Sequence, residues 1–183
     1  MKITIIGRGR VGGGLARLFQ AAGHEVDALG REGGDATEAD VVLVAVPGDA
    51  IEDALGKVSG VEGKVVLDAT NPLAGRPPGV DSLAHQVKAR TNGPVAKAFN
   101  TNFERLFDEV AGARNRPSAL YCGDESARDV AEELMRAAGY EPVFAGGLEN
   151  AAALEDFVAG VMLPVLMSGR GPFFYRIGGP ADI

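Results

Sequence analysis

The chain has 183 residues, a formal net charge of −7 and a single cysteine, Cys122. This length suits one domain with a full core. The negative charge argues against general nucleic-acid binding and disfavours anionic membranes, and one cysteine excludes both an internal disulfide and a multi-cysteine metal site. We see no run of about 18 apolar residues that would span a membrane and no signal peptide. We therefore expect a cytoplasmic protein without a membrane or nucleic-acid partner.

The stretch from Lys2 to Val26 has the pattern of a strand, a glycine turn, a helix and a second strand. Ile3, Ile5 and Ile6 belong to a short apolar run without a polar face, which is typical of a parallel strand covered on both sides. An apolar stripe with helical spacing follows the glycines, and Gly23 is placed to end that helix. The pattern predicts the first half of a dinucleotide-binding unit.

The glycine turn from Gly7 to Gly12 matches the motif G-x-G-x-x-G. We expect Gly7 to permit the sharp turn out of the strand, Gly9 to let a pyrophosphate approach the backbone, and Gly12 to allow close helix packing. The helix start then offers free N–H groups and a positive dipole end to phosphate. The motif predicts a dinucleotide site, and the alternative is a glycine-rich turn that binds nothing.

The second predicted strand, from His24 to Leu29, is followed by Gly30, Arg31 and Glu32. Many dinucleotide folds place an acid near here to hold the ribose 2′-hydroxyl of NAD. Arg31 instead offers a cation and a fork of donors to a 2′-phosphate, which favours NADP. The neighbouring Glu32, together with the alternative that Arg31 is simply a solvated surface residue, leaves NAD open.

The middle of the chain alternates between predicted strands and helices. The segment 33–40 is too short and polar for the usual crossover helix, so we expect a loop there. Strands are predicted over 41–46, 64–68 and 94–99, and helices over 50–58 and from about 81 to 89. The loop 45–48 lies at the carboxyl end of a parallel strand, where open α/β sheets bind their ligands.

The last part of the chain ends in a long apolar helix. Before it we predict a weak, lid-like helix over 104–112, strands over 119–122 and 142–145, and a helix over 126–138. The apolar helix runs from near Leu148 toward Met167, with a kink at Pro164 and a short aromatic strand-like end after it. Because it is apolar on more than one face, we expect a homodimer interface on it; a deep internal helix is the alternative.

These elements predict an α/β fold with a Rossmann-type, mostly parallel sheet, helices on both faces and a long C-terminal helix. We expect a single NAD(P)-binding domain over 1–183, with 148–183 as a C-terminal helical extension.

Seven stretches in chain order resemble the coenzyme F420-dependent NADP oxidoreductase family, also described as predicted dinucleotide-binding reductases. They are ITIIGRGRVGGGLA, GHEV, DVVLVAVP, GKVVLDATNPL, PVAKAFNT, YCGD and GGLENAAALE. Many NADP-linked dehydrogenases share the first and third, whereas ATNPL and KAFNT are more specific. The resemblance implies a Rossmann domain with a C-terminal helical segment, often a dimer, and hydride transfer between NADP(H) and a deazaflavin.

The resemblance also implies which residues hold the coenzymes. By this resemblance, the pyrophosphate and ribose would be contacted by Arg8, Gly9, Arg10 and Val11. The 2′-phosphate would be held by Gly30 and Arg31. The nicotinamide side is implied for Ala45, Pro47 and Ile51, with Ala69 and Asn71 nearby. The loops 71–73 and 99–101 would face the second cofactor. The full predicted set is Gly7, Arg8, Gly9, Arg10, Val11, Gly12, Gly30, Arg31, Ala45, Val46, Pro47, Ile51, Ala69 and Asn71.

The chain departs from the family pattern in three ways. It lacks the longer segment before DVVLVAVP, it has Gly30 where a serine or threonine is common, and it has two arginines in its glycine loop. Besides F420, a flavin such as FMN therefore stays open as the acceptor.

Hydride transfer between two stacked rings depends on proximity and needs no nucleophile, so we predict no catalytic side chain and no metal ligand. Two alternatives stay open. One is an NADP(H)-dependent dehydrogenase of a small carbonyl, imine or hydroxy acid, with Lys97 or His85 as proton donor. The other is a non-enzymatic dinucleotide-binding sensor.

Overall fold

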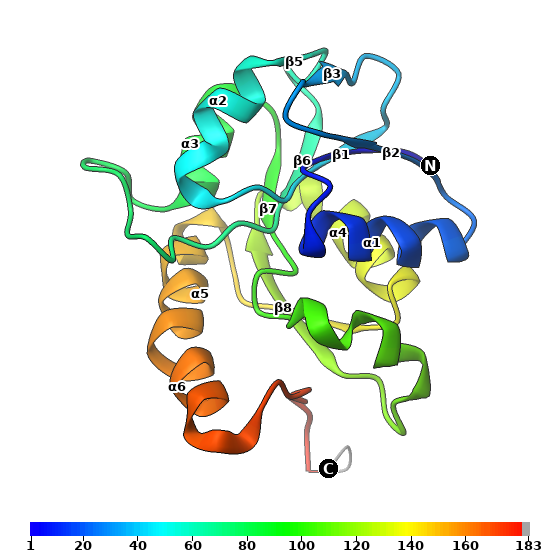
Figure 1. The fold of residues 1–183 in the computed structure, drawn as a ribbon, viewed down its shortest axis with the longest axis vertical. Helices are drawn as coiled ribbons and strands as arrows, with labels where there is room; N and C mark the ends of the chain where they lie inside the picture. Colours follow the sequence, from blue (N-terminus) through cyan, green and yellow to red (C-terminus); the bar gives the residue numbers. More distant parts are fainter. Residues whose placement is uncertain (181–183) are drawn as a thin grey trace.

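The computed structural model describes residues 1–180 as a seven-stranded sheet with helices on both faces (Figure 1). The strands are β1 (Lys2–Ile6), β2 (Glu25–Leu29), β4 (Val41–Val44), β6 (Val65–Asp68), β7 (Val95–Lys97), β8 (Ser118–Gly123) and β9 (Glu141–Phe144). Their order is β2-β1-β4-β6-β7-β8-β9, parallel except where β7 meets β8. The direction of winding reverses between β1 and β4, which opens a crevice at their carboxyl ends. The predicted Rossmann-type fold is confirmed.

The helices divide between the two faces of the sheet. They are α1 (Arg10–Ala21), α2 (Ile51–Gly56), α3 (Leu83–Thr91), α4 (Glu125–Ala137) and α5 (Ala151–Phe157), with 3-10 helices η1 (Gly48–Ala50) and η2 (Glu104–Gly112). The buried side chains of α1, α4 and η2 form one core cluster with the sheet, and those of α2, α3 and α5 form a second on the other face. Both clusters take alternate residues of the same strands, which explains why these strands carry no polar face.

The short link after β2 forms no helix, as predicted. Instead β3 (Gly34–Asp35) pairs in parallel with β5 (Val58–Ser59) in a small separate sheet. The turn before β3 needs Gly33, which has φ +79° and whose added Cβ would lie 2.1 Å from the Lys57 carbonyl oxygen. The link is therefore held tightly against the end of α2.

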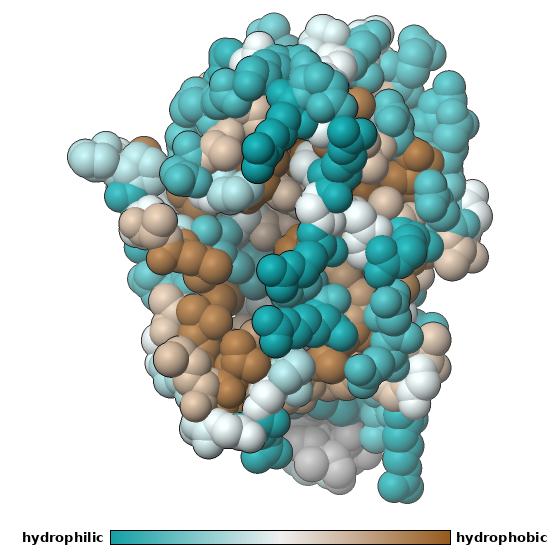
Figure 2. All heavy atoms as spheres, viewed as in Figure 1, coloured by the Kyte–Doolittle hydropathy of each residue, from teal (hydrophilic) through white to brown (hydrophobic). Residues whose placement is uncertain are grey.

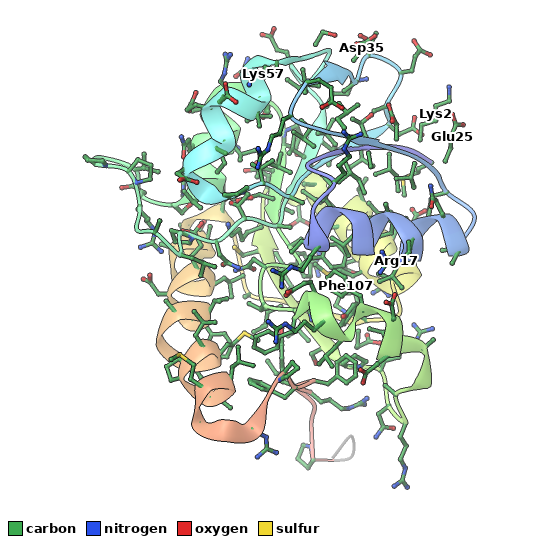
Figure 3. All side chains as sticks on the ribbon, in the orientation of Figure 1. Lys2, Arg17, Glu25, Asp35, Lys57 and Phe107 are labelled. Atoms are coloured by element: carbon green, nitrogen blue, oxygen red, sulfur yellow. The ribbon has the colours of Figure 1, made fainter. Side chains whose placement is uncertain are left out.

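The segment η2 packs against α1. The sequence predicted a weak helix or a lid-like segment here. Figure 3 shows Phe107 directly beside α1, and a Cβ on Gly14 would lie 2.5 Å from the Phe107 ring. At the rim, Arg17 of α1 donates to Asp108 at 3.0 Å. Because Leu106, Phe107 and Val110 are buried, η2 belongs to the core of the domain.

The C-terminal helical segment runs from Leu148 to Arg170, with a kink at Gly169, whose φ is +92°. It comprises η3 (Leu148–Asn150), α5, η4 (Val158–Met162), α6 (Leu163–Val165) and η5 (Leu166–Arg170). Around Pro164, which lacks an N–H, the helix widens into π turns. An 18-residue window within Leu148–Arg170 reaches a mean hydropathy of 1.6, which would suffice to cross a membrane by length and composition alone. Glu155 and Asp156 lie in every such window, so it is not the uninterrupted apolar run that the sequence analysis excluded, and the core helix of a soluble protein can pass the same test.

The chain after this helix returns to the sheet. The predicted aromatic strand does not form a regular ladder, but Ser118 N–H donates to the Tyr175 carbonyl at 2.9 Å. The Tyr175 hydroxyl contacts the Thr101 hydroxyl at 2.6 Å and accepts from the Leu120 N–H at 3.0 Å. Burial raises the pKa of Tyr175, so it remains a neutral hydrogen-bonding anchor. The anchor ties the C-terminal segment to β8 and to the loop after β7.

Candidate functional site

The glycine turn has the geometry that its motif predicts. Gly7 has φ +106°, and an added Cβ would lie 2.4 Å from the Ala45 carbonyl oxygen. A Cβ on Gly12 would lie 1.8 Å from the Gly7 carbonyl oxygen and 3.1 Å from the Ile5 side chain. Real Cβ atoms do not approach that closely, so both positions require glycine. The turn brings α1 into close contact with β1.

The middle glycine of the motif, Gly9, faces open space within the described residues. A Cβ on Gly9 would meet no heavy atom within 4 Å, and Gly9 is exposed at the start of α1. No side chain caps this helix and no acid lies in its first turn. Its first N–H groups therefore point into open space with the positive end of the helix dipole behind them. This is the backbone arrangement that accepts a pyrophosphate.

The end of β2 lies beside the glycine turn, because the Gly7 N–H donates to the Leu29 carbonyl at 3.0 Å. Arg8 reaches toward this end and pairs with Glu32 at 3.2 Å. Arg31 is exposed and forms no ion pair within residues 1–180. The predicted 2′-phosphate position therefore carries two guanidinium groups, one of them already paired with a carboxylate.

The predicted nicotinamide side lies at the carboxyl ends of β4 and β6. Ala45, Val46, Pro47 and Asn71 keep exposed surface there. Two further predicted residues are buried, since Ile51 is 0% exposed and Ala69 is 7% exposed. Ile51 packs in the core below α2, so the structure places it behind the edge rather than on it.

The loop after β7 differs from its expected role. Phe99 has φ +62°, a left-handed conformation that is strained for a bulky residue. This conformation turns its ring into the core, where it contacts Phe19 and Tyr140 at ring-centre distances of 5.9 and 6.4 Å. Asn100 and Thr101 are also buried. The side chains of 99–101 therefore support the site from beneath and do not face a second cofactor.

Asn100 instead binds the predicted site residue Asn71. The Asn71 side chain donates to the Asn100 carbonyl at 2.8 Å, and the Asn100 side chain donates to Asn71 Oδ1 at 3.1 Å and to the Leu154 carbonyl at 3.2 Å. This pair of amides joins the carboxyl ends of β6 and β7 to α5. It fixes the position of Asn71 at the edge of the sheet.

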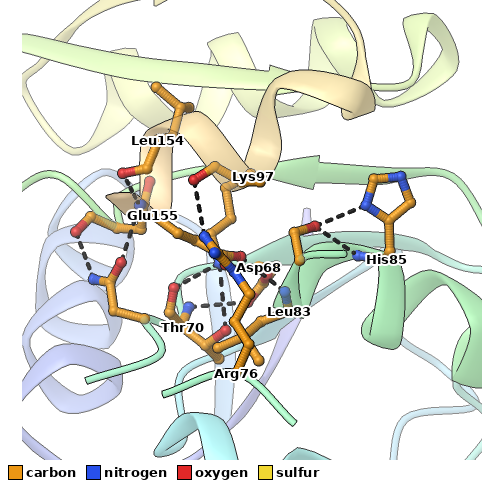
Figure 4. A network of polar contacts seen from close by, with 12 residues as sticks. Asp68, Thr70, Arg76, Leu83, His85, Lys97, Leu154 and Glu155 are labelled. Carbon is orange, nitrogen blue, oxygen red and sulfur yellow. Dashed lines mark hydrogen bonds and ion pairs between the residues drawn. The ribbon is translucent and has the colours of Figure 1, made fainter. Parts of the chain in front are cut away.

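A buried ion cluster lies next to this pair and is the feature that the sequence analysis missed. Lys97, Asp68 and Glu155 are each 0% exposed at the side chain, and the Lys97 ammonium lies 2.8 Å from Asp68 and 2.9 Å from Glu155 (Figure 4). Its third donor position is taken by the Thr70 carbonyl at 2.6 Å. We define these three charged residues as the ion cluster. The ammonium donates to Asp68 and to the Thr70 carbonyl and forms an ion pair with Glu155, so the buried charge is compensated.

The ion cluster extends to the loop that crosses the sheet edge. Arg76 donates to Glu155 at 2.9 Å and to Asp156 at 2.8 Å, and the Leu83 N–H donates to Glu155 at 2.9 Å. Although partial burial opposes its charge, these carboxylates raise the pKa of Arg76. Glu155 therefore binds α5 to β7, to the loop 71–82 and to the start of α3.

The two candidate proton donors both make contacts within the protein, and of the two only His85, which is half-buried, keeps exposed surface. The Lys97 side chain is 0% exposed and is enclosed by Asp68 and Glu155. Its ammonium therefore reaches neither solvent nor an open ligand position. His85 lies at the start of α3, where its Nδ1 contacts the Ser82 hydroxyl at 2.8 Å and its N–H donates to the same oxygen at 3.2 Å. This bond completes the N-terminal cap of α3. Both residues have structural roles.

Two surface hollows lie away from the glycine turn. One is lined by Lys88, Asn92, Pro94 and Asp124 at the amino end of β7, and the other by residues at the amino ends of β1 and β2. In the described residues no group of three or more metal-ligating side chains is assembled. The candidate site is therefore defined by the glycine turn and the strand ends at the carboxyl edge of the sheet, and not by either hollow.

Comparison with known proteins gives a fold but no sequence family. Neither a known family profile nor a curated protein matches the chain. A protein from Arthrobacter sp. FB24, named provisionally as an F420-dependent NADP-reductase, matches with a TM-score of 0.79 and 24% identity over 98% of this chain and 100% of that one. The predicted resemblance is thus confirmed at the level of fold.

Two further solved structures share the arrangement. A hypothetical protein from Sinorhizobium meliloti has 26% identity and a TM-score of 0.63, over 83% of this chain and 87% of its own. The reductive aminase from Aspergillus terreus, solved with NADPH and ethyl levulinate, has 17% identity and a TM-score of 0.63, over 92% of this chain and 62% of its own. The long chain of the aminase shows that this fold also occurs as part of a larger enzyme.

Proposed function

We propose that the protein is an NADP(H)-dependent oxidoreductase that transfers a hydride between nicotinamide and a deazaflavin such as F420, or a flavin such as FMN. The open position over Gly9 carries this proposal, because Gly7 and Gly12 are sterically required, whereas within residues 1–180 no heavy atom beyond the two chain neighbours of Gly9 lies within 4 Å of a Cβ placed there. The full-length match to a structure named as an F420-dependent NADP-reductase supports the choice of acceptor.

The residues of the chain supply binding and orientation. The N–H groups at the start of α1 would hold the pyrophosphate, and Arg31 would pair with the 2′-phosphate. Ala45, Val46 and Pro47 would form one wall of the nicotinamide position, and the fixed amide of Asn71 would border it. NADPH supplies the hydride when bound. The apolar wall of Ala45, Val46 and Pro47 would limit the access of water to one side of the nicotinamide position.

The dehydrogenase alternative is weakened by the positions of the two proton donors. Reduction of a carbonyl or imine requires a proton at the edge of the site. Lys97 is fully buried between Asp68 and Glu155, and the Nδ1 of His85 contacts the hydroxyl of Ser82, the residue that caps α3. Transfer between two ring cofactors needs neither residue, which favours the first proposal.

We further propose a cytoplasmic homodimer formed through the outer half of the C-terminal helix. Figure 2 shows apolar side chains gathered over the region of α5 and α6. Val161 is 46% exposed and Met167 is 83% exposed, whereas the first half of the helix is held on the sheet by Glu155. Two copies of this surface would cover each other.

Titration of the purified protein with NADP, NAD, FMN and F420, followed by NADPH oxidation in the presence of each acceptor, tests the function. We expect NADP to bind and NADPH to be oxidised by F420 or FMN, with activity retained in His85→Ala. Tight NADP binding without reduction of any acceptor would support the sensor instead. Absence of heat with either nicotinamide coenzyme would contradict the proposal.

Light scattering tests the dimer. We expect a mass of two chains for the wild-type protein and one for Met167→Asp with Val161→Asp. A wild-type monomer, or association of the protein with lipid vesicles through this helix, would contradict it.

A further inference from the structure

The turn after β2 holds a carboxylate where a coenzyme ribose would lie. Residues 30–33 form a four-residue turn, in which the Gly33 N–H donates to the Gly30 carbonyl at 3.3 Å. Gly34, the next residue, donates to the Lys57 carbonyl at 3.2 Å, so the turn cannot swing away from the sheet. Arg31 and Glu32 occupy its two corner positions. Their side chains are therefore kept close to the end of β2.

Arg8 approaches the same point from the glycine turn. Its guanidinium pairs with Glu32 at 3.2 Å, and both side chains are 63% exposed. A Cβ on Gly30 would lie 2.5 Å from the Glu32 carboxylate and 2.7 Å from the Arg8 guanidinium carbon. The absence of a side chain at Gly30 thus leaves the space in which this ion pair lies. Both partners are the far ends of flexible side chains, so the pair can open.

The two nicotinamide coenzymes would meet this pair differently. A 2′-phosphate is an anion that pairs with guanidinium groups and is repelled by a carboxylate. A 2′-hydroxyl is a donor that binds a carboxylate and gains little from an arginine. With Arg8, Arg31 and Glu32 around one bare backbone position, the chain offers a partner to each coenzyme.

We propose, resting on the proposed function, that Glu32 is a specificity-determining residue that sets the ratio of NADP to NAD binding. In the free protein its carboxylate occupies the anion position beside Arg8. A 2′-phosphate must displace it, which reduces the preference for NADP. The 2′-hydroxyl of NAD donates to it directly. The protein therefore binds both coenzymes. Arg31 favours NADP, and Glu32 reduces the difference in affinity between NADP and NAD.

Because the ion pair is exposed, the expected effect is moderate. Pairs of this kind change an equilibrium by about twofold to fivefold, and less at high salt. We expect Glu32→Gln to tighten NADP about twofold to fivefold and to weaken NAD by a similar factor. The ratio of the two dissociation constants should then rise by about fivefold or more.

Calorimetric titration of wild type and Glu32→Gln with NADP and NAD, at low and high salt, measures this ratio. Glu141→Gln is the matched control, since Glu141 is exposed on β9 at the opposite edge of the sheet from β2. We expect the control to leave the ratio unchanged. The circular dichroism spectrum should be the same for all three proteins.

A second variant separates an electrostatic role from a change in folding. In an Arg8→Gln background, Glu32→Gln should still weaken NAD, but it should tighten NADP less than it does in the wild type, because no Arg8 guanidinium is left for Glu32 to release. If Glu32→Gln left the ratio of the NADP and NAD dissociation constants unchanged in both backgrounds, the inference would be overturned. In that case, NADP binding by the wild type would still support the proposed function. Binding of neither coenzyme by the wild type would overturn both.

Discussion

The glycine turn and the ion cluster lie at the same carboxyl edge of the sheet, but they are built in opposite ways. The turn is made of backbone, and the space over Gly9 is open. The ion cluster is made of side chains, and Lys97, Asp68 and Glu155 are completely enclosed. At the turn, the first N–H groups of α1 have no side-chain cap in the described residues. In the ion cluster, the Lys97 ammonium is already engaged by protein groups.

This difference separates binding from support. An open helix start with free N–H groups is suited to an anionic ligand because the donors are fixed in advance. Charges that already satisfy each other have no capacity left for a ligand, but losing one of them exposes the rest to desolvation. We therefore expect variants of the turn to affect coenzyme binding, and variants of the cluster to affect stability.

The largest expected effect comes from Glu155→Gln. Removing one charge leaves Lys97 and Arg76 undercompensated in a buried setting, so the free energy of unfolding should fall by about 3–5 kcal/mol. Urea unfolding measures it. Asp156→Asn is the control, because Asp156 binds the same arginine with a side chain that is 68% exposed, and should cost less than about 1 kcal/mol. A loss below about 1 kcal/mol for Glu155→Gln would contradict the supporting role.

Within the turn, Gly12→Ala and Gly9→Ala should separate stability from binding. The first places a Cβ 1.8 Å from the Gly7 carbonyl and should cost about 3 kcal/mol. The second meets nothing within 4 Å and should change stability by less than about 1 kcal/mol. It should nevertheless weaken NADP at least about tenfold, which is about 1.4 kcal/mol. Unaltered NADP affinity in Gly9→Ala would mean that the open space is not the pyrophosphate position.

At the end of β2, Arg31→Ala should weaken NADP by about 1.5–3 kcal/mol and leave NAD nearly unchanged, because only NADP carries a 2′-phosphate. Parallel titrations with the two coenzymes measure the difference. Arg170→Ala, at the exposed end of the C-terminal helix, removes the same charge elsewhere and should affect neither. Equal losses for both coenzymes would remove the 2′-phosphate role of Arg31.

The smallest expected effect concerns a second polar contact, on the far face of the sheet from the ion cluster. The Tyr121 hydroxyl donates to Glu132, and this bond, aided by Arg136, lowers the pKa of Glu132 to about 2. A carboxyl with a lowered pKa stabilises the fold at neutral pH and loses that contribution as the pH falls from about 4.5 toward 2. The difference in unfolding free energy between wild type and Glu132→Gln, on the order of 1 kcal/mol, should therefore shrink over that interval.

The matched variant for this measurement is Glu133→Gln, the exposed neighbour on α4. Its difference from wild type should not vary over the same acid range. If the Glu132→Gln difference stayed constant from pH 6 to pH 2, the lowered pKa would be wrong.

Much of the fold follows from local pattern. Ile3, Ile5 and Ile6 give a strand buried on both faces, and the three glycines of the turn have the geometry expected from their spacing. The polar link 33–40 is as short as predicted and contains no helix. These features depend on periodicity and on the conformations open to glycine, and both can be read from neighbouring residues.

The supporting half of the site could not be read in this way. Asp68, Lys97 and Glu155 come from three separate elements, and only the sheet order and the path of α5 bring them together. The sequence does show that each of these charged residues lies inside or beside an apolar run, which indicates a buried side chain. It does not show which residues pair with one another.

By itself, then, the sequence determined the strands, the glycine turn and the cation at Arg31, because each depends on a few consecutive residues. Only the tertiary structure decided that Lys97 is sealed between two carboxylates, that Phe99 turns inward and that Arg8 meets Glu32 over Gly30. Those outcomes depend on the distances between segments far apart in the chain, and local pattern carries no information about such distances.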